Sequence, residues 1–419
     1  MKMVCTSTPA FDSDRNSYRK LALISLSHPV LLHGILSVST GHMHNYGRAD
    51  DRLLSSRQSR ALTSLRAALN AFQMTSEGAG GQHHPTTREP DPFSRSTGVF
   101  SVLSPRGVTL AAIMMQTSSV LMTGIGSVEV HMKCALHFIR DLGYMDHGPP
   151  AHSVFMRLLV QRFAMVDVVL AHLRFRRPLA PLDFYMYRPH EDLDSSEPAF
   201  REIQGCPQRV LCFMAHIAVL AADLVQGNSP PDQVQAEAYA LETSMRAWGH
   251  RYHEAMGGSR AAVSPLLPQE TQSSPAEQLV LLEVVCECFY WTAHLLLMRR
   301  VFLDATTTAR VQLIRRHLFR LMDSIPAGCG PDSSLPFPFY MAAREAVAYE
   351  DREWVRRKHV AWLDIYRDRS REYMMASTER IWEKRMAMGE VAPDGVEPWD
   401  APFEVFIREM DHQASYFMF

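Results

Sequence analysis

Histidine is the residue type in this chain that could most readily support metal chemistry, and 19 histidines are present. His42 and His44 are two positions apart in a helix-like run, so their side chains would diverge by about 200° and could not share one ion. His131 and His137 are six apart, and no HExxH or HxxxH pattern pairs with a carboxylate third ligand. We interpret the histidines as ordinary helix-face residues and predict no metal site.

The 7 cysteines are scattered, and the odd count without framework spacing is typical of a reducing compartment. Cys286 and Cys288 would diverge on a helix, and no second pair follows at zinc-finger spacing, so we predict buried core cysteines. Cys206 lies between a glycine and a proline. A thiol at a helix start can be activated by a basic neighbour, but the flanking glycine and proline favour a turn here.

Motifs of nucleophilic and phosphate chemistry are absent from the sequence. It contains no G-x-S-x-G elbow and no P-loop, and the Gly124-Ile125-Gly126 segment lacks the third glycine of a dinucleotide fingerprint. The acids near residue 350 have basic partners close by, and Glu353 and Arg357 form an i,i+4 pair in the favourable order. We therefore predict no catalytic residue and no cofactor.

Basic residues form short clusters, most of which suit an exposed helix face or a helix C-terminus. The RFRRPLAP segment is the most plausible exception, because Arg174, Arg176 and Arg177 could contact phosphates or serve as a weak nuclear import signal.

The composition shows no overall positive charge of the kind that DNA-binding domains usually carry. The chain has 43 basic and 45 acidic residues, a net charge of −2, and 47% hydrophobic residues. The first residues are polar, which is unlike a signal peptide, and the apolar 210–225 segment falls short of the roughly 20 residues of a membrane span. These features predict a soluble intracellular protein with no membrane contact.

Hydrophobic residues recur at three- and four-residue intervals through most of the chain, and no stretch alternates with period two. We therefore predict an all-α fold, a multi-helix bundle or array. Long loops rich in small residues and prolines are expected near 75–97 and 257–275. The expected helices are Pro29–Gly47, Leu53–Phe72, Val108–Met122, Val128–Leu142, Val154–Leu173, Pro207–Val225, Gln233–His250, Ala276–Phe302, Thr307–Ile325, Tyr340–Tyr366 and Arg371–Met388.

Eight segments in order resemble one known family. They include HPVLLHGILSVSTGHMH, RLLVQRFAMVDVVLAHLRFRRP, IQGCPQRVLCFMAHIAVLA, AEAYALETSMRAW and the long Ser324–Leu363 stretch beginning SIPAGCGPDSS. This order is similar to the second type of fungal-specific transcription factor domain, the helical regulatory body usually found behind a zinc binuclear-cluster head. The likeness spans 18–410, and we expect residues 1–17 to be a disordered N-terminus.

The resemblance implies a nuclear transcription regulator of a fungal secondary-metabolite or nutrient pathway; otherwise the cytoplasm would be expected. The family's zinc cluster uses six cysteines near the N-terminus, but only Cys5 precedes Cys134 here, so these residues cannot build it. We therefore expect DNA to be reached only indirectly, through a protein partner such as a zinc-cluster factor, or through a homodimer. A small-molecule effector could bind between the helices.

Two alternatives remain open. An upstream exon absent from this gene prediction could supply the DNA-binding head. Alternatively, the helical body could be a small-molecule-binding protein or an enzyme of a biosynthetic pathway, with some of its 24 methionines lining an adaptable apolar pocket. Methionine at helical spacing, as at Met114, Met115 and Met122, is more often part of the core.

Overall fold

The protein is seen in a computed structural model that describes residues 9–14, 16–77, 103–124, 126–146, 154–185, 198–255, 275–367 and 369–387. These ranges contain fifteen α-helices, one short 3-10 helix and no strand, which confirms the predicted all-α fold. The elements are α2 (Tyr18–Ser25), α3 (Pro29–Asn45), α4 (Asp51–Glu77), α5 (Pro105–Thr123), α6 (Val128–Asp141), α7 (Val154–Leu173), α8 (Leu182–Tyr185), α9 (Pro198–Gln204), α10 (Gln208–Gln226), α11 (Pro231–Ala255), α12 (Pro275–Arg300), α13 (Ala309–Asp323), η3 (Pro331–Ser334), α14 (Pro336–Ala343), α15 (Tyr349–Tyr366) and α16 (Arg369–Ala387).

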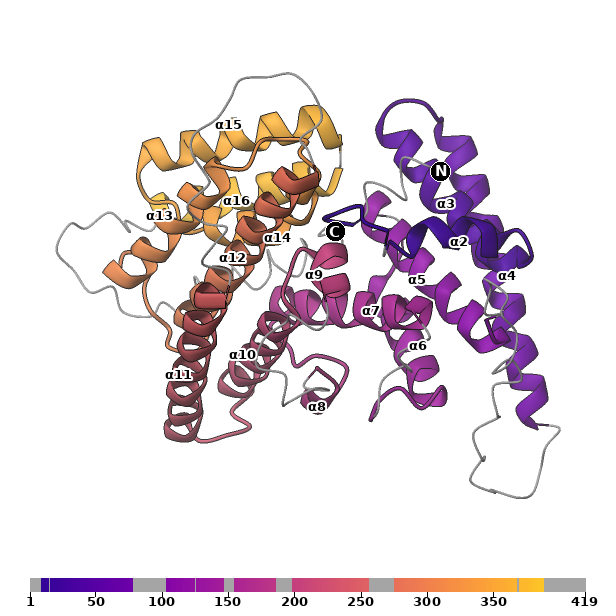
Figure 1. The fold of residues 1–419 in the computed structure, drawn as a ribbon, viewed down its shortest axis with the longest axis horizontal. Coiled ribbons are helices and arrows are strands. Elements are labelled where there is room, and N and C mark those ends of the chain that lie inside the picture. Colours follow the sequence, from indigo (N-terminus) through magenta and orange to yellow (C-terminus); the bar gives the residue numbers. More distant parts are fainter. Residues whose placement is uncertain are drawn as a thin grey trace.

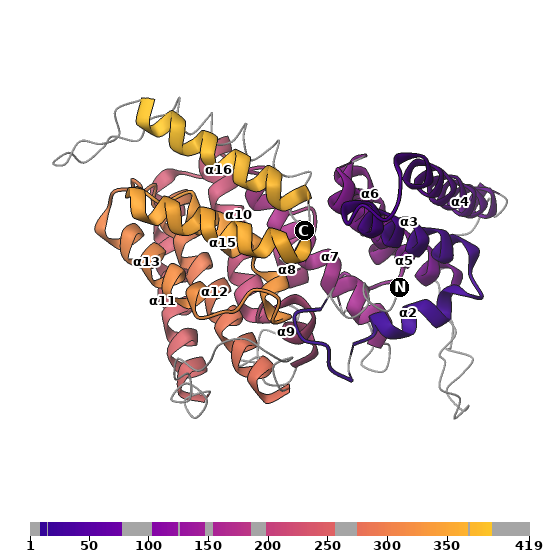
Figure 2. The ribbon, with the colours of Figure 1, turned by 90° about the horizontal axis from the view of Figure 1, so that it is seen from above.

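The helices form two groups joined through α7 (Figure 1). In the first group α3, α4 and α6 pack on α5, and α2 packs on α3. In the second group α10, α11, α13 and α14 pack on α12, and α16 packs on α14 and α15. Helix α7 contacts α5 and α6 on one side and α9 and α10 on the other, and α16 also reaches α5 (Figure 2). One contiguous cluster of buried hydrophobic side chains runs from Tyr18 to Trp382 through both groups. The two groups therefore share a single core.

Several helix ends follow local sequence signals. Ser104 caps the N-terminus of α5 because its hydroxyl accepts a 3.2 Å hydrogen bond from the Gly107 amide, and Pro105 is the first residue of the helix. Gly227 caps the C-terminus of α10 with a φ of 66°, which glycine adopts at little cost. Predicted boundaries based on such signals agree well with the structure, and α7 matches Val154–Leu173 at both ends.

The predicted continuous helix Tyr340–Tyr366 is wrong. Helix α14 ends at Ala343, and α15 begins only at Tyr349. The intervening residues have helix-forming side chains, but Arg344, Glu345 and Ala346 are all buried in tertiary contacts. Glu345 forms ion pairs with side chains from two other helices, and this long-range pairing prevails over local helix propensity.

The segments expected to be irregular are only partly described. Residues 9–14 and 16–17 lie within the range expected to be disordered, and part of this segment contacts α9, where the Phe11 amide donates a 2.7 Å hydrogen bond to the Glu202 carbonyl. The predicted loops 75–97 and 257–275 lie outside the described residues, except that α4 continues through Glu77 and α12 begins at Pro275. The domain limits 18–410 stay a prediction.

Helices α10 and α12 are long and apolar enough to cross a membrane by length and composition. In each, 67% of the most apolar window is buried inside the fold. Both pack against other helices of the shared core, and their apolar character is accounted for by that packing.

Candidate functional site

The three arginines of the RFRR segment follow the end of α7, and each pairs with an acid of a neighbouring helix. Arg174 pairs with Glu129 of α6, and Arg176 lies 3.4 Å from the same carboxylate. Arg177 donates two hydrogen bonds, of 2.7 and 2.6 Å, to the two carboxylate oxygens of Asp223 on α10. A phosphate would have to compete with these carboxylates. The proposed nuclear signal and phosphate contact stay predictions.

Asp167 of α7 fixes the chain that follows these arginines. Its fully buried carboxylate accepts hydrogen bonds of 3.0 Å from the amides of Leu179 and Ala180, and one of 2.5 Å from the Tyr185 hydroxyl. Burial raises the pKa of Asp167, although these hydrogen bonds and the Arg176 charge oppose the rise. The segment after α7 is thus tied down by both buried hydrogen bonds and ion pairs.

Phe175 has a positive φ of 47°, which is unusual for a residue with a side chain. This conformation accompanies a close contact with α12, where the Arg300 guanidinium lies 3.9 Å from the centre of the Phe175 ring. Arg300 also donates a 2.6 Å hydrogen bond to the carbonyl of His172. The end of α7 is thereby joined to the end of α12.

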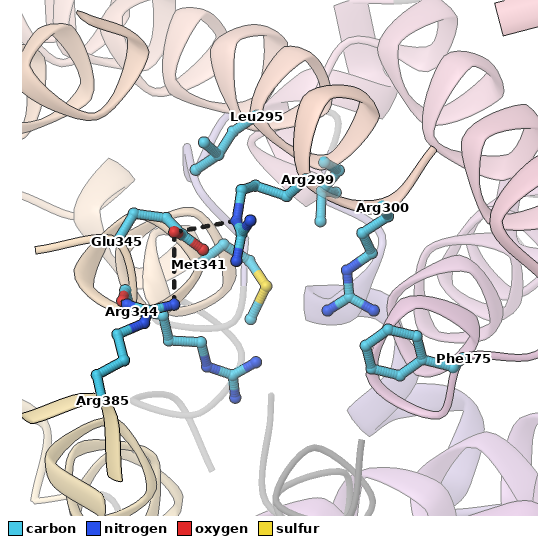
Figure 3. Close-up of a pocket in the computed structure, with 9 residues that line it drawn as sticks. Phe175, Leu295, Arg299, Arg300, Met341, Arg344, Glu345 and Arg385 are labelled. Atoms are coloured by element: carbon cyan, nitrogen blue, oxygen red, sulfur yellow. Dashed lines mark hydrogen bonds and ion pairs between the residues drawn. The ribbon is translucent and has the colours of Figure 1, made fainter. Parts of the chain in front are cut away.

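A cavity of about 40 Å³ lies beside this contact (Figure 3). Its walls come from four parts of the chain that are far apart in sequence: the end of α7, the last turn of α12, the end of α14 with the residues after it, and α16. The lining residues are Phe175, Leu295, Leu296, Arg299, Arg300, Met341, Arg344, Glu345 and Arg385.

Arginine dominates the polar part of this cavity. Arg299 lies 3.1 Å and Arg385 lies 3.6 Å from Oε2 of Glu345, which is an acidic residue among the described residues of the lining. Figure 3 shows these two side chains directed toward Glu345, whereas Arg300 is directed toward Phe175. The Arg344 guanidinium lies between these two groups in the same view.

Glu345 carries a negative charge in this setting. Its burial would raise its pKa, but the charges of Arg299 and Arg385 and a hydrogen bond from Thr306 outweigh burial and lower the pKa to about 2. The Thr306 hydroxyl donates that bond over 2.6 Å. The carboxylate therefore stays ionised across the physiological range, and it is paired with the arginines around it.

Sequence reasoning missed this cavity. Arg299 and Arg300 form only a short basic cluster like others in the chain, and Arg344, Glu345 and Arg385 gave no signal because charged residues are common within a helix-like pattern. Phe175 had been singled out only as part of the RFRR segment. Bringing these residues together depends on the break after α14, which the periodicity did not predict.

The other sequence candidates have structural roles. Cys286 and Cys288 are buried, which confirms their interpretation as core residues, and Cys206 is buried between α9 and α10. Among the described residues, no group of three His, Cys, Asp or Glu side chains could hold a metal ion. Glu353 pairs with Arg356, three positions on, so the predicted pair with Arg357 is wrong.

The model of the fungal-specific transcription factor domain family matches residues 1–417, nearly the whole sequence. The chain therefore belongs to this family, as its motifs predicted, and the family supports a role in transcription regulation. Searches of curated proteins and of solved structures found no match.

Proposed function

We propose that this chain is a nuclear regulatory body that controls transcription through a protein partner. The observation that carries the proposal is the family match over residues 1–417, in a sequence where a single cysteine precedes Cys134. The zinc cluster that reads DNA in such regulators needs six cysteines, which these residues do not provide, and the proposal assigns that step to a partner protein.

The charge distribution supports the same proposal. The net charge is −2, and the basic segment after α7 is neutralised by Glu129, Asp167 and Asp223. Non-specific attraction to DNA arises from clustered cations that displace counterions from phosphates. A surface whose arginines already pair with carboxylates provides little of that attraction.

DNA binding by the isolated chain tests the proposal. We expect the purified 419-residue chain to show no sequence-selective shift of genomic promoter fragments at physiological salt. The tagged chain, crosslinked in cells, should co-purify with a zinc-cluster protein and with a restricted set of promoters, and deletion of that partner should abolish the promoter signal. Tight, selective promoter binding by the isolated chain would contradict the proposal.

Localisation provides a second test. A fluorescent fusion should accumulate in the nucleus. If the half-exposed Arg177 belongs to an import signal, Arg177→Ala should lower the nuclear fraction, whereas Arg246→Ala on α11 should not. Arg246 is a suitable control because its side chain is also exposed and also pairs with an acid. A fusion excluded from the nucleus would refute the nuclear role.

The second candidate function is that of a small-molecule-binding protein or an enzyme in a biosynthetic pathway, which the arginine-lined cavity favours. Deleting the gene separates the two functions. Altered transcripts of a gene set indicate regulation, whereas unchanged transcripts with the loss of one chemical step indicate an enzyme.

A further inference from the structure

Helix α4 concentrates positive charge in a chain that is otherwise acidic. Residues 52–72, which make up most of this helix, contain four basic residues and no acidic residue. The whole chain has a net charge of −2, so the residues outside this range together carry −6. Such a local asymmetry of charge is typical of a surface that meets a polyanion. The four basic residues are Arg52, Arg57, Arg60 and Arg66.

Three of these arginines share one side of the helix, which we call the basic face of α4. With 3.6 residues per turn, Arg52, Arg60 and Arg66 lie within about 120° of one another around the axis, and the first and last are about 21 Å apart along it. All three are exposed, whereas Arg57 is half-buried at the border of the face. Exposed polar residues lie between and beside the arginines on this side: Ser55, Ser56, Ser59, Thr63 and Asn70.

The opposite side of α4 is fixed in the fold. Leu54, Ala61 and Leu65 are buried where α4 packs against α3 and α5. The Gln58 amide also donates a 3.1 Å hydrogen bond to the hydroxyl of Thr123 on α5. Both views place α4 at the outer edge of the first helix group, away from α10 to α16 (Figures 1 and 2). The core contacts therefore hold the basic face toward solvent.

Within the described part of the chain, none of the four guanidinium groups of α4 forms a hydrogen bond or an ion pair. Asp51, directly before the basic run, lies 2.8 Å from His44. The RFRR segment differs, because its arginines pair with Glu129, Asp167 and Asp223. The arginines of α4 thus present their charge to whatever meets this face.

We propose that the basic face of α4 binds the phosphate backbone of duplex DNA without reading its sequence. Arginine, serine, threonine and asparagine side chains are groups that contact phosphates and sugars, and such contacts position a protein on the duplex. A duplex presents roughly 12 phosphates along 21 Å of its axis, which is enough for every arginine of the helix. This goes beyond the proposed function, in which a partner selects the promoter: α4 adds a sequence-independent contact to the same DNA.

Two other anionic partners fit this face less well. A helix that lies on an anionic membrane inserts an apolar face, but the apolar side of α4 is buried in the core. The centre of a protein–protein interface is poor in charged residues, whereas here the centre is charged, and the exposed Leu53 and Leu62 lie at opposite edges. Protein–DNA interfaces are more polar and more positively charged, as this face is.

Fluorescence anisotropy of the purified full chain with a labelled duplex of random sequence tests the proposal. Titrations at KCl concentrations between about 25 and 200 mM give the slope of log K against log[KCl]. We expect weak binding with a slope of about −3 to −4, because each phosphate contact releases counterions and contributes about −0.9. Three duplexes of unrelated sequence should bind within about twofold of one another, since phosphate contacts carry no sequence information.

Charge-removing variants assign the binding to α4. Arg60→Gln should weaken binding to all three duplexes equally and make the slope less steep by about 1. The combination of Arg52→Gln, Arg60→Gln and Arg66→Gln should make it less steep by about 3 and weaken binding about tenfold or more at the lowest salt. Arg246→Gln on α11 is the matched control, because it removes the same charge from an exposed arginine that pairs with Glu242 at 2.5 Å. It should leave affinity and slope unchanged.

Glutamine is a good helix former, and circular dichroism checks that each variant keeps its helical content. If the triple variant loses stability, the slope of Arg60→Gln decides. The proposal is overturned if the natural chain does not bind DNA at the lowest salt, if neither the triple variant nor Arg60→Gln changes the slope, or if one duplex is preferred more than about tenfold.

Labelled poly-L-glutamate distinguishes DNA from an acidic protein segment as the partner. We expect it to bind more weakly than the duplex under the same conditions. Tighter binding of poly-L-glutamate, lost in the triple variant, would assign the basic face to an acidic protein segment and overturn the proposal. Recruitment by a zinc-cluster partner is measured by co-purification in cells, so failure of DNA binding by α4 leaves the proposed function standing.

Discussion

The Tyr366 hydroxyl, at the last residue of α15, donates a 2.5 Å hydrogen bond to Oδ1 of Asp332. Asp332 is completely buried, and its carboxylate also accepts hydrogen bonds from the amides of Gly328 at 2.7 Å and Gly330 at 3.0 Å. The Gly- and Pro-rich segment between α13 and α14 is therefore ordered around one carboxylate and held against α15. Burial and the Asp332 charge raise the pKa of Tyr366, so its hydroxyl remains a donor.

Replacing Tyr366 by phenylalanine tests this relationship. The change leaves the ring in place and removes one donor to a buried carboxylate, so we expect the free energy of unfolding to fall by about 2 kcal/mol. Urea unfolding monitored by circular dichroism measures the difference. Tyr349→Phe, at the first residue of the same helix and 69% exposed, should have no measurable effect. Equal stability of the two variants would show that the Asp332 contact contributes little.

Gly205, directly after α9, is constrained by both conformation and space. Its φ is 70°, and an added Cβ would lie 2.5 Å from Cβ of Ser334 and 3.2 Å from Cγ1 of Val285. Gly143 has a similar φ of 73°, with nothing within 4 Å of an added Cβ. We expect Gly143→Ala to cost about 1–2 kcal/mol for the left-handed conformation. Gly205→Ala should cost a further 1–3 kcal/mol, roughly, for overpacking, measured by the same unfolding experiment. Equal losses in the free energy of unfolding of the two variants would mean that Ser334 moves aside at no measurable cost.

The paired hydrogen bonds between Arg177 and Asp223 should make a modest contribution to stability. The Arg177 side chain is 52% exposed and Asp223 is 7% exposed, so solvent screens part of the attraction. A double-mutant cycle with Arg177→Met and Asp223→Asn should give a coupling free energy of about 1 kcal/mol. The exposed Arg246–Glu242 pair, also on a helical surface, should give about 0.3–0.5 kcal/mol. A coupling no larger than that of the control pair would mean that Arg177 remains available for other partners.

The sequence predicted most of the fold because helical periodicity and local capping signals are dense in this chain. Pro29 at the start of α3 and Gly227 after α10 mark their boundaries through backbone preferences that do not depend on tertiary contacts. The break between α14 and α15 could not be predicted in this way. Arg344 and Glu345 are good helix formers, and the chain departs from a helix here because Glu345 forms ion pairs with Arg299 and Arg385, which are remote in sequence.

The same limit applies to the cavity. Its four arginines are spread over Arg299 to Arg385, and no local pattern distinguishes them from the surface arginines of α15 or α16. The RFRR segment stood out because its charges are adjacent, yet its arginines pair with Glu129, Asp167 and Asp223. Adjacent arginines are visible in the sequence, whereas the arginines around the cavity come together only through packing.

Three buried histidines should make the stability of the chain depend on pH. Burial, with a nearby arginine in each case, lowers the pKa of His172 to about 3 and those of His294 and His359 to about 4, compared with 6.5 for a free side chain. The folded state therefore holds these rings neutral, and the unfolded state binds the protons more readily. Their contribution to stability is complete above about pH 6.5 and is lost as the pH falls toward about 4.

We therefore expect the free energy of unfolding to decrease between pH 7 and pH 5, with a slope of up to about 1.4 kcal/mol per pH unit for each histidine. Glu345 affects stability only at lower pH, because its carboxyl gains a proton only below its ordinary pKa of 4.5. His172→Gln should reduce the slope by the contribution of one histidine, because glutamine does not bind a proton in this range. The glutamine amide can still donate toward the Met214 carbonyl, which lies 2.9 Å from Nε2 of His172.

Urea unfolding at pH 7, 6 and 5 and constant ionic strength measures the slope. His137→Gln, whose side chain is 67% exposed, should leave it unchanged. A slope that is the same in His172→Gln as in the natural sequence would show that His172 does not take up a proton on unfolding.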